Sequence, residues 1–209
     1  MQFNAQKSKC LIAVIPRNKL FLQRYVSSCK FQIGGNPIEL VEKFTHLGHV
    51  INSNMDDNDD IQIKHDVFVK QTNNVLCYFN KLDSFVKNNL HHSYCMNLYG
   101  CEIWSLCCNK IDKICVTWRK AMRRVWNIQY NTHSAYLPLI CHCLPLFDEI
   151  CRRSVNFLYG CLTGSSSLVR SITAHGIFYG LNHSFIGRNI NFCLRRYKCL
   201  LADFTSDRI

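Results

Sequence analysis

The sequence is poor in the features that mark disordered and membrane-spanning proteins. Its 209 residues include only four prolines and nine glycines, and 19% of them are charged against 48% that are apolar. Disordered chains show the opposite balance, so a folded core is expected. The longest uncharged stretch, residues 125–147, contains two prolines and two histidines, which a helix in a bilayer would tolerate poorly. We therefore expect no membrane partner.

Patterns for secretion and for metal binding are also absent. The apolar run at residues 10–15 is short and follows two lysines, so we expect an intracellular protein, nuclear or cytoplasmic, that is not secreted. Among the fourteen cysteines no two are three residues apart, so the C-x-x-C half of a zinc site is missing. A disulfide framework is not expected without secretion. Cys101, Cys108 and Cys115 are interpreted as small buried side chains, and no metal or cofactor is expected.

Acidic residues are scarce in most of the chain. Twenty-five Lys and Arg against fourteen Asp and Glu give a formal charge of +11 and a pI of about 9.1. Residues 1–60 hold seven basic and six acidic side chains, a net of +1, whereas residues 61–209 hold eighteen and eight, a net of +10. An uneven positive field favours a polyanionic partner. The alternative is that the charge only keeps a basic protein soluble.

Hydrophobic periodicity predicts a short β unit followed by helices. Residues 9–15 and 44–51 are typical of strands, in an antiparallel unit that is too small to stand alone. A stripe at spacings of three and four predicts a long helix after the polar turn at 52–60; its members are Phe68, Thr72, Val75, Phe79, Leu82 and Val86. Further helices are predicted at residues 90–104, 110–126, 147–160 and 183–201. The predicted fold is α+β, mostly α.

The helix at residues 110–126 combines an apolar face with a basic one. The apolar face consists of Ile111, Ile114, Trp118, Met122 and Val125. The candidates for phosphate contact are Lys113, Arg119, Lys120, Arg123 and Arg124, and the only acid near them is Asp112. Lysine and arginine bind phosphates through charge-assisted hydrogen bonds that carry little sequence information. A solvated face normally mixes signs, so phosphate contact is favoured over simple solvation.

Several segments occur in the order and spacing of one family. They are residues 3–10 (FNAQKSKC), 44–51 (FTHLGHVI), 59–61 (DDI), 98–104 (LYGCEIW), 118–126 (WRKAMRRVW) and 153–157 (RSVNF). Each piece alone is common, but the ordered set covers most of residues 3–160. Together the segments resemble the C-terminal part of the reverse transcriptase of non-LTR retrotransposons.

The resemblance implies a chain of three parts. Residues 1–52 would be the end of a polymerase palm with its primer-grip hairpin, residues 53–130 a helical thumb, and residues 131–209 a helical post-thumb extension. Lys7 matches the family lysine that approaches the incoming triphosphate. Leu47 and Gly48 match the hairpin that grips the primer end. The thumb would hold the template–primer duplex.

The resemblance also implies that this chain does not catalyse by itself. Nucleotide addition needs two metal ions held by palm aspartates, and in the family that Asp-Asp pair precedes the segment matched by residues 4–9. We therefore expect Mg²⁺ only in the full-length family enzyme, Lys7 to be idle here, and a missing palm and fingers portion to be a further candidate partner. Met55-Asp56-Asp57 imitates the polymerase box, but polar residues and a helix follow it, which predicts a solvated turn.

The expected function is that of a truncated fragment of an RNA-directed DNA polymerase. Such a fragment would bind template–primer nucleic acid, either an RNA–DNA hybrid or a duplex backbone, without catalysis. The alternative is a helical nucleic-acid- or protein-binding module that has no polymerase role. A cysteine-rich zinc protein is a third hypothesis, which the cysteine spacing disfavours.

Overall fold

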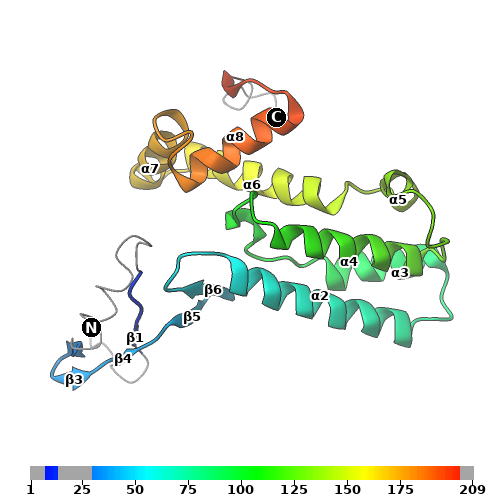
Figure 1. The fold of residues 1–209 in the computed structure, drawn as a ribbon, viewed down its shortest axis with the longest axis horizontal. Coiled ribbons are helices and arrows are strands. Elements are labelled where there is room, and N and C mark those ends of the chain that lie inside the picture. The colour runs from blue at the N-terminus through cyan, green and yellow to red at the C-terminus, as the bar shows by residue number, and fades with distance from the viewer. Residues whose placement is uncertain (1–7, 14–29, 203–209) are drawn as a thin grey trace. The chain divides into compact units, whose positions relative to one another are not determined.

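The chain divides into two compact units, each of which is described by itself. The computed structural model describes residues 8–13 and 30–202 (Figure 1). The first unit is Met1–Asp60 and the second is Ile61–Ile209. The predicted class, α+β and mostly α, is confirmed, because short two-stranded sheets precede a series of long helices.

The described residues of the first unit form six short strands. They are β1 (Lys9–Cys10), β2 (Gln32–Ile33), β3 (Asn36–Pro37), β4 (Glu39–Leu40), β5 (Lys43–His46) and β6 (His49–Asn52). β2 and β3 pair antiparallel, as do β5 and β6, whereas β1 and β4 pair in parallel. The sequence predicted only antiparallel pairing, and it extended the first strand to residue 15, although the strand ends at Cys10. Pairs of this length are marginal by themselves.

Residues 44–51, which periodicity predicted as a single strand and the resemblance as a hairpin around Leu47 and Gly48, are a hairpin. His46 faces His49 in the register of β5 and β6, so Leu47 and Gly48 form a two-residue loop. Both loop residues have positive φ, 48° and 76°. This is the requirement of a tight hairpin turn whose twist matches that of the strands. Glycine meets that requirement without strain, whereas leucine adopts it rarely.

Helices make up the second unit. The α-helices are α2 (Asn58–Tyr78, whose first turn belongs to the first unit), α3 (Ser84–Cys95), α4 (Lys110–Val125), α5 (Leu137–Cys141), α6 (Leu146–Thr163), α7 (Ser167–Phe178) and α8 (Phe185–Tyr197). Two short 3₁₀ turns lie between them, at Cys101–Ile103 and Ser134–Tyr136. Figure 1 shows α4 running between α2 and α6. No helix in the described part of the chain has the length and apolar character needed to cross a bilayer.

The main core is formed around α4. Its predicted apolar face is buried throughout, and Trp118 is 3% exposed, which confirms its assignment to the core. Phe68 on α2 and Trp104 after the first 3₁₀ turn join the same cluster. Cys101 and Cys115 are also buried, as the sequence predicted, while Cys108 is half-buried. A smaller cluster of Leu158, Ile177 and Ile190 joins α6, α7 and α8.

The long helix predicted through residue 86 is in fact two helices. α2 ends at Tyr78, and α3 begins at Ser84 because the Asp83 carboxylate accepts the backbone N–H of Phe85 at 2.8 Å, as an N-cap residue does. Phe79 is therefore 39% exposed, whereas Phe68 on the same stripe is 1% exposed. The prediction of a buried Phe79 is wrong.

Two predictions for residues 131–209 also need correction. A complete helix, α7, was missed because its serine-rich approach and its Gly176 are typical of a loop. The Ser166 hydroxyl accepts the backbone N–H of Val169 and starts this helix. The last helix, α8, is shorter than predicted, since Lys198 adopts a left-handed conformation just beyond Tyr197 and ends it.

Candidate nucleic-acid interface

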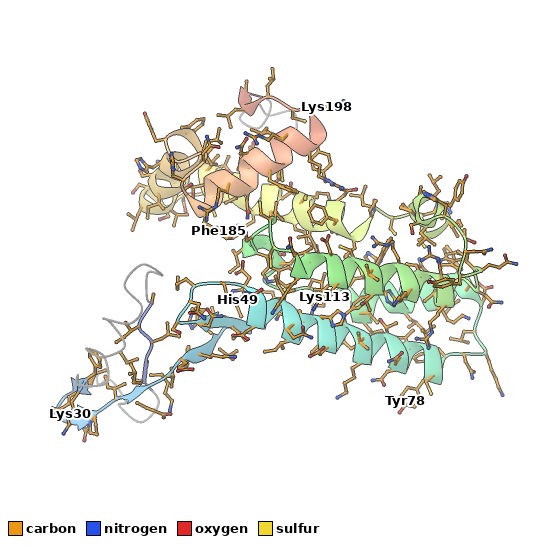
Figure 2. All side chains as sticks on the ribbon, in the orientation of Figure 1. Lys30, His49, Tyr78, Lys113, Phe185 and Lys198 are labelled. Carbon is orange, nitrogen blue, oxygen red and sulfur yellow. The ribbon has the colours of Figure 1, made fainter. Side chains whose placement is uncertain are left out.

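The basic side of α4 faces away from the core. Lys113, Lys120 and Arg124 are separated by seven and four residues, which places them on one line along the helix, and all three are exposed. Figure 2 shows Lys113 on α4, beside α2. These three side chains form the exposed basic line of α4, and they are the strongest part of the predicted site.

α2 runs alongside this line and in the same direction. His65 Nε2 lies 2.9 Å from Thr117 Oγ1, and the Arg124 guanidinium donates to the Asn73 carbonyl oxygen at 3.0 Å, eight residues further along α2. These two contacts between α2 and α4 fix the orientation of α4. Arg124 makes one side-chain hydrogen bond, to the neutral amide of Asn73. The other N–H groups of the Arg124 guanidinium can therefore donate two hydrogen bonds to a phosphate.

Arg119 and Arg123 lie on a different flank of α4 and are half-buried. Arg123 donates to the backbone oxygen of Thr132 at 2.8 Å, to Ser134 Oγ at 3.0 Å and to the backbone oxygen of Arg119 at 3.4 Å. These bonds join the end of α4 to the segment that leads into the next 3₁₀ turn. Arg123 is thus bonded within the fold, and the phosphate role predicted for it stays a prediction.

Three arginines of residues 131–209 form ion pairs with carboxylates. Arg152 and Arg153 both bind Glu149, with distances of 2.8 and 2.9 Å, and Arg196 binds Asp148 at 2.9 Å. Burial raises the pKa of Glu149, but the hydrogen bonds from Arg152 and Arg153 outweigh it, and the pKa lies below its ordinary value. These pairs neutralise part of the positive charge of the second unit.

The predicted primer-grip residues lie at the tip of the β5–β6 hairpin. Leu47 is 75% exposed there. At the base of the hairpin, the backbone N–H of Val50 donates to Asp60 Oδ1 at 3.0 Å, and His49 Nδ1 lies 3.0 Å from Asp60 Oδ2. Asp60 is fully buried, so the hairpin is fastened to a fixed carboxylate while its tip remains accessible.

The imitation of the polymerase box is a turn. Asp56 Oδ1 accepts the Asn52 amide at 3.1 Å and the backbone N–H of Asn58 at 3.0 Å. Burial raises the pKa of Asp56, but these hydrogen bonds lower it by more, so the pKa lies below its ordinary value. Met55 has a φ of 53°, and α2 begins three residues later. The turn and helix start predicted from the sequence are confirmed.

The remaining predictions about the site concern Lys7 and metals. Lys7 lies outside the described residues. Within residues 8–13 and 30–202 no three His, Cys, Asp or Glu side chains are grouped so that they could hold a metal ion. The expectation that the chain needs no metal stays a prediction.

A cavity between α3, α4 and the segment after α5 was not predicted. Its volume is about 420 Å³, and its lining includes Asn88, His92, Trp118, Trp126, Cys141 and Cys143. Trp126 donates its indole N–H to Asn88 Oδ1 at 3.3 Å, which joins α3 to the end of α4. Three separate segments contribute to this lining, so no local sequence pattern could have revealed it.

Comparisons with known proteins give no match. No family model, no curated protein and no solved structure matches this chain. The case for a function therefore depends on the residues and contacts of the chain itself.

Proposed function

We propose that this chain binds the backbone of a nucleic-acid duplex through the exposed basic line of α4, Lys113, Lys120 and Arg124. The observation that carries the proposal is the arrangement of these three cations on one accessible line of a helix whose opposite face is buried. A rigid helix keeps the spacing of its charges fixed, so neighbouring phosphates can be bound without ordering a loop.

We further propose that the chain is derived from a reverse transcriptase of the non-LTR type and holds an RNA–DNA hybrid without catalysing synthesis. The ordered segments at residues 3–160 support this origin, and the hairpin with Leu47 and Gly48 at its accessible tip suits a primer contact. Asp56 is occupied by Asn52 and Asn58, which supports a structural role for it. A primer-extension assay with Mg²⁺ should therefore show no incorporation above background.

The salt dependence of binding tests the interface. The affinity of the full chain for a labelled duplex is measured over a range of salt concentrations. The double variant Lys113→Gln, Lys120→Gln should reduce the slope of log K against log salt by about 2, since each phosphate contact contributes roughly 0.9. Arg123 is left unchanged because its bonds to Thr132 and Ser134 would make a loss of stability and a loss of binding hard to separate.

A matched control has the same change of charge elsewhere. Lys81 and Lys198 are exposed and lie outside α4, so Lys81→Gln, Lys198→Gln should keep the wild-type slope. If the α4 variant is folded and its slope equals that of the control, the exposed basic line is not the binding surface.

The choice of nucleic acid separates the two candidate origins. A polymerase-derived module should bind an RNA–DNA hybrid more tightly than a DNA duplex of the same sequence at equal salt. Equal affinity for both would favour the alternative, a helical binding module with no polymerase role.

A further inference from the structure

Two cysteine side chains meet on the wall of the 420 Å³ cavity. Cys141 ends α5 and is 3% exposed, while Cys143 is half-buried and lies two residues later. The two thiols are near enough for each to shift the pKa of the other. This pair is separate from the exposed basic line of α4 and has no part in the function proposed above.

The backbone brings the pair within disulfide range. His142, between the two cysteines, has a left-handed conformation with φ 50° and ψ 42°. Its dihedral angles mirror those of a helix, so the Cα atoms of its neighbours are about 5.4 Å apart by helix geometry. This separation lies inside the window of roughly 4.4–6.8 Å that disulfides require, whereas an extended residue would place them near its upper limit. The backbone bonds from Cys143 N–H to Pro138 and from His142 N–H to Leu139 hold this turn.

The contact makes the two thiols unequal. The neighbouring Cys141 thiol lowers the pKa of Cys143, and its effect outweighs burial and the negative charge of Glu149, which both raise that pKa. The neighbouring Cys143 thiol and burial raise the pKa of Cys141. Cys143 is therefore the thiol of the pair that ionises more readily, and thiolates rather than thiols attack electrophiles. Its position on the cavity wall gives a small oxidant a route to the sulfur atom.

We propose that Cys143 is a peroxide-sensitive thiol and that Cys141 is its resolving partner. The Cys143 thiolate attacks one oxygen of hydrogen peroxide, the O–O bond breaks, and hydroxide leaves and is protonated to water. The resulting sulfenic acid is attacked by the Cys141 sulfur; an S–S bond forms, the S–O bond breaks, and the departing hydroxide takes the Cys141 proton as a second water. Two thiols and one peroxide thus yield one disulfide and two waters.

Peptide mapping of the intact chain tests this reaction. The reduced protein is treated with increasing hydrogen peroxide, remaining thiols are alkylated, and the chain is cut with trypsin and Asp-N. Residues 125–147 are then released as one peptide whose only cysteines are Cys141 and Cys143. We expect this peptide to become two hydrogens lighter and to resist alkylation at peroxide doses that leave the exposed thiols of Cys77, Cys107 and Cys199 alkylated.

Variants distinguish the two roles. In Cys141→Ser, the sulfenic acid should persist at Cys143 and be captured by dimedone; in Cys143→Ser, Cys141 should remain a thiol. Cys151→Ser is the matched control, because Cys151 also has a neighbouring thiol that shifts its pKa, that of Cys193, and does not line this cavity. It should leave the oxidation unchanged. The proposal is overturned if the wild-type peptide is still fully alkylated when Cys77 is oxidised, a result that needs no variant to fold.

Discussion

At the scale of single residues, Arg123 differs from the exposed cations of α4 because its side chain is bonded within the fold. Its guanidinium binds the backbone oxygen of Thr132 and the hydroxyl of Ser134. Arg123→Gln should lower the free energy of unfolding by about 1.5–3 kcal/mol, since hydrogen bonds that involve a charged group contribute about that much. Lys120→Gln removes the same charge from an exposed position and should change stability by less than about 0.5 kcal/mol. Denaturant unfolding of both variants compares them, and equal losses would show that Arg123 is not a structural residue.

His91 provides a second test at this scale, through pH. It is buried on α3, its Nε2 lies 3.1 Å from Thr72 Oγ1, and its ring meets the edge of Phe68. Burial, aided by the charge of His92, lowers the pKa of His91 from 6.5 to about 4. Above pH 6.5 the His91 side chain is neutral in both the folded and the unfolded chain. Below that pH the unfolded chain binds a proton that the folded chain refuses, so stability falls between pH 6.5 and 4.

The expected loss is up to about 3 kcal/mol at pH 4, because each pH unit in this window contributes about 1.4 kcal/mol. The measurement is the free energy of unfolding at a series of pH values. His91→Gln should remove most of this dependence, whereas His92→Gln, at an exposed position, should retain it. If the wild-type and His91→Gln curves run parallel from pH 7 to 4, His91 titrates normally in the folded state.

At the scale of elements, Gly187 sets how closely α8 approaches the turn after α7. A Cβ atom on Gly187 would lie 2.3 Å from the backbone oxygen of Gly180 and 2.5 Å from the Cα of Leu181. Backbone atoms cannot move aside as a side chain can, so Gly187→Ala should cost about 1–3 kcal/mol by overpacking. Gly160→Ala is the matched control on α6, where nothing lies within 4 Å. It should stabilise the chain by about 0.5–1 kcal/mol, since alanine favours the helix. Thermal unfolding that ranks the two variants alike would contradict this packing.

The elements also show what the sequence could and could not predict. α4 was predicted almost to the residue, because its apolar residues keep a helical period and all of them are buried in one core. The stripe through Phe79 has the same period, but the Asp83 cap starts a new helix, and a local hydrogen bond decides where the chain turns. The spacing of apolar residues alone does not show where one helix ends and the next begins.

The candidate site shows the same division. The basic residues of α4 were visible in the sequence because they share one short segment, and Lys113, Lys120 and Arg124 are exposed as expected. The role of Arg123 was not visible, because its acceptors, Thr132 and Ser134, follow in an irregular segment. The thiol pair at Cys141 and Cys143 could be seen as a spacing, but its reactivity depends on the left-handed His142 and on the cavity beside it.

At the scale of the whole molecule, the two units differ in how they are stabilised. The second unit contains both hydrophobic clusters and three buried or half-buried tryptophans, whereas the described strands of the first unit form two-stranded pairs with few buried side chains. Two-stranded pairs open easily, and amide exchange reports the free energy of such opening. Hydrogen exchange followed residue by residue should therefore be slowest in α4 and fastest in β2 and β3.

Within the first unit the β5–β6 hairpin should exchange at an intermediate rate, because the N–H of Val50 is bonded to the buried carboxylate of Asp60. Asp60→Asn weakens this acceptor and should speed exchange at Val50 while α4 keeps its wild-type protection. If β2 and β3 were instead protected as strongly as α4, the first unit would be a self-contained domain, and the proposed derivation from a polymerase palm would be contradicted.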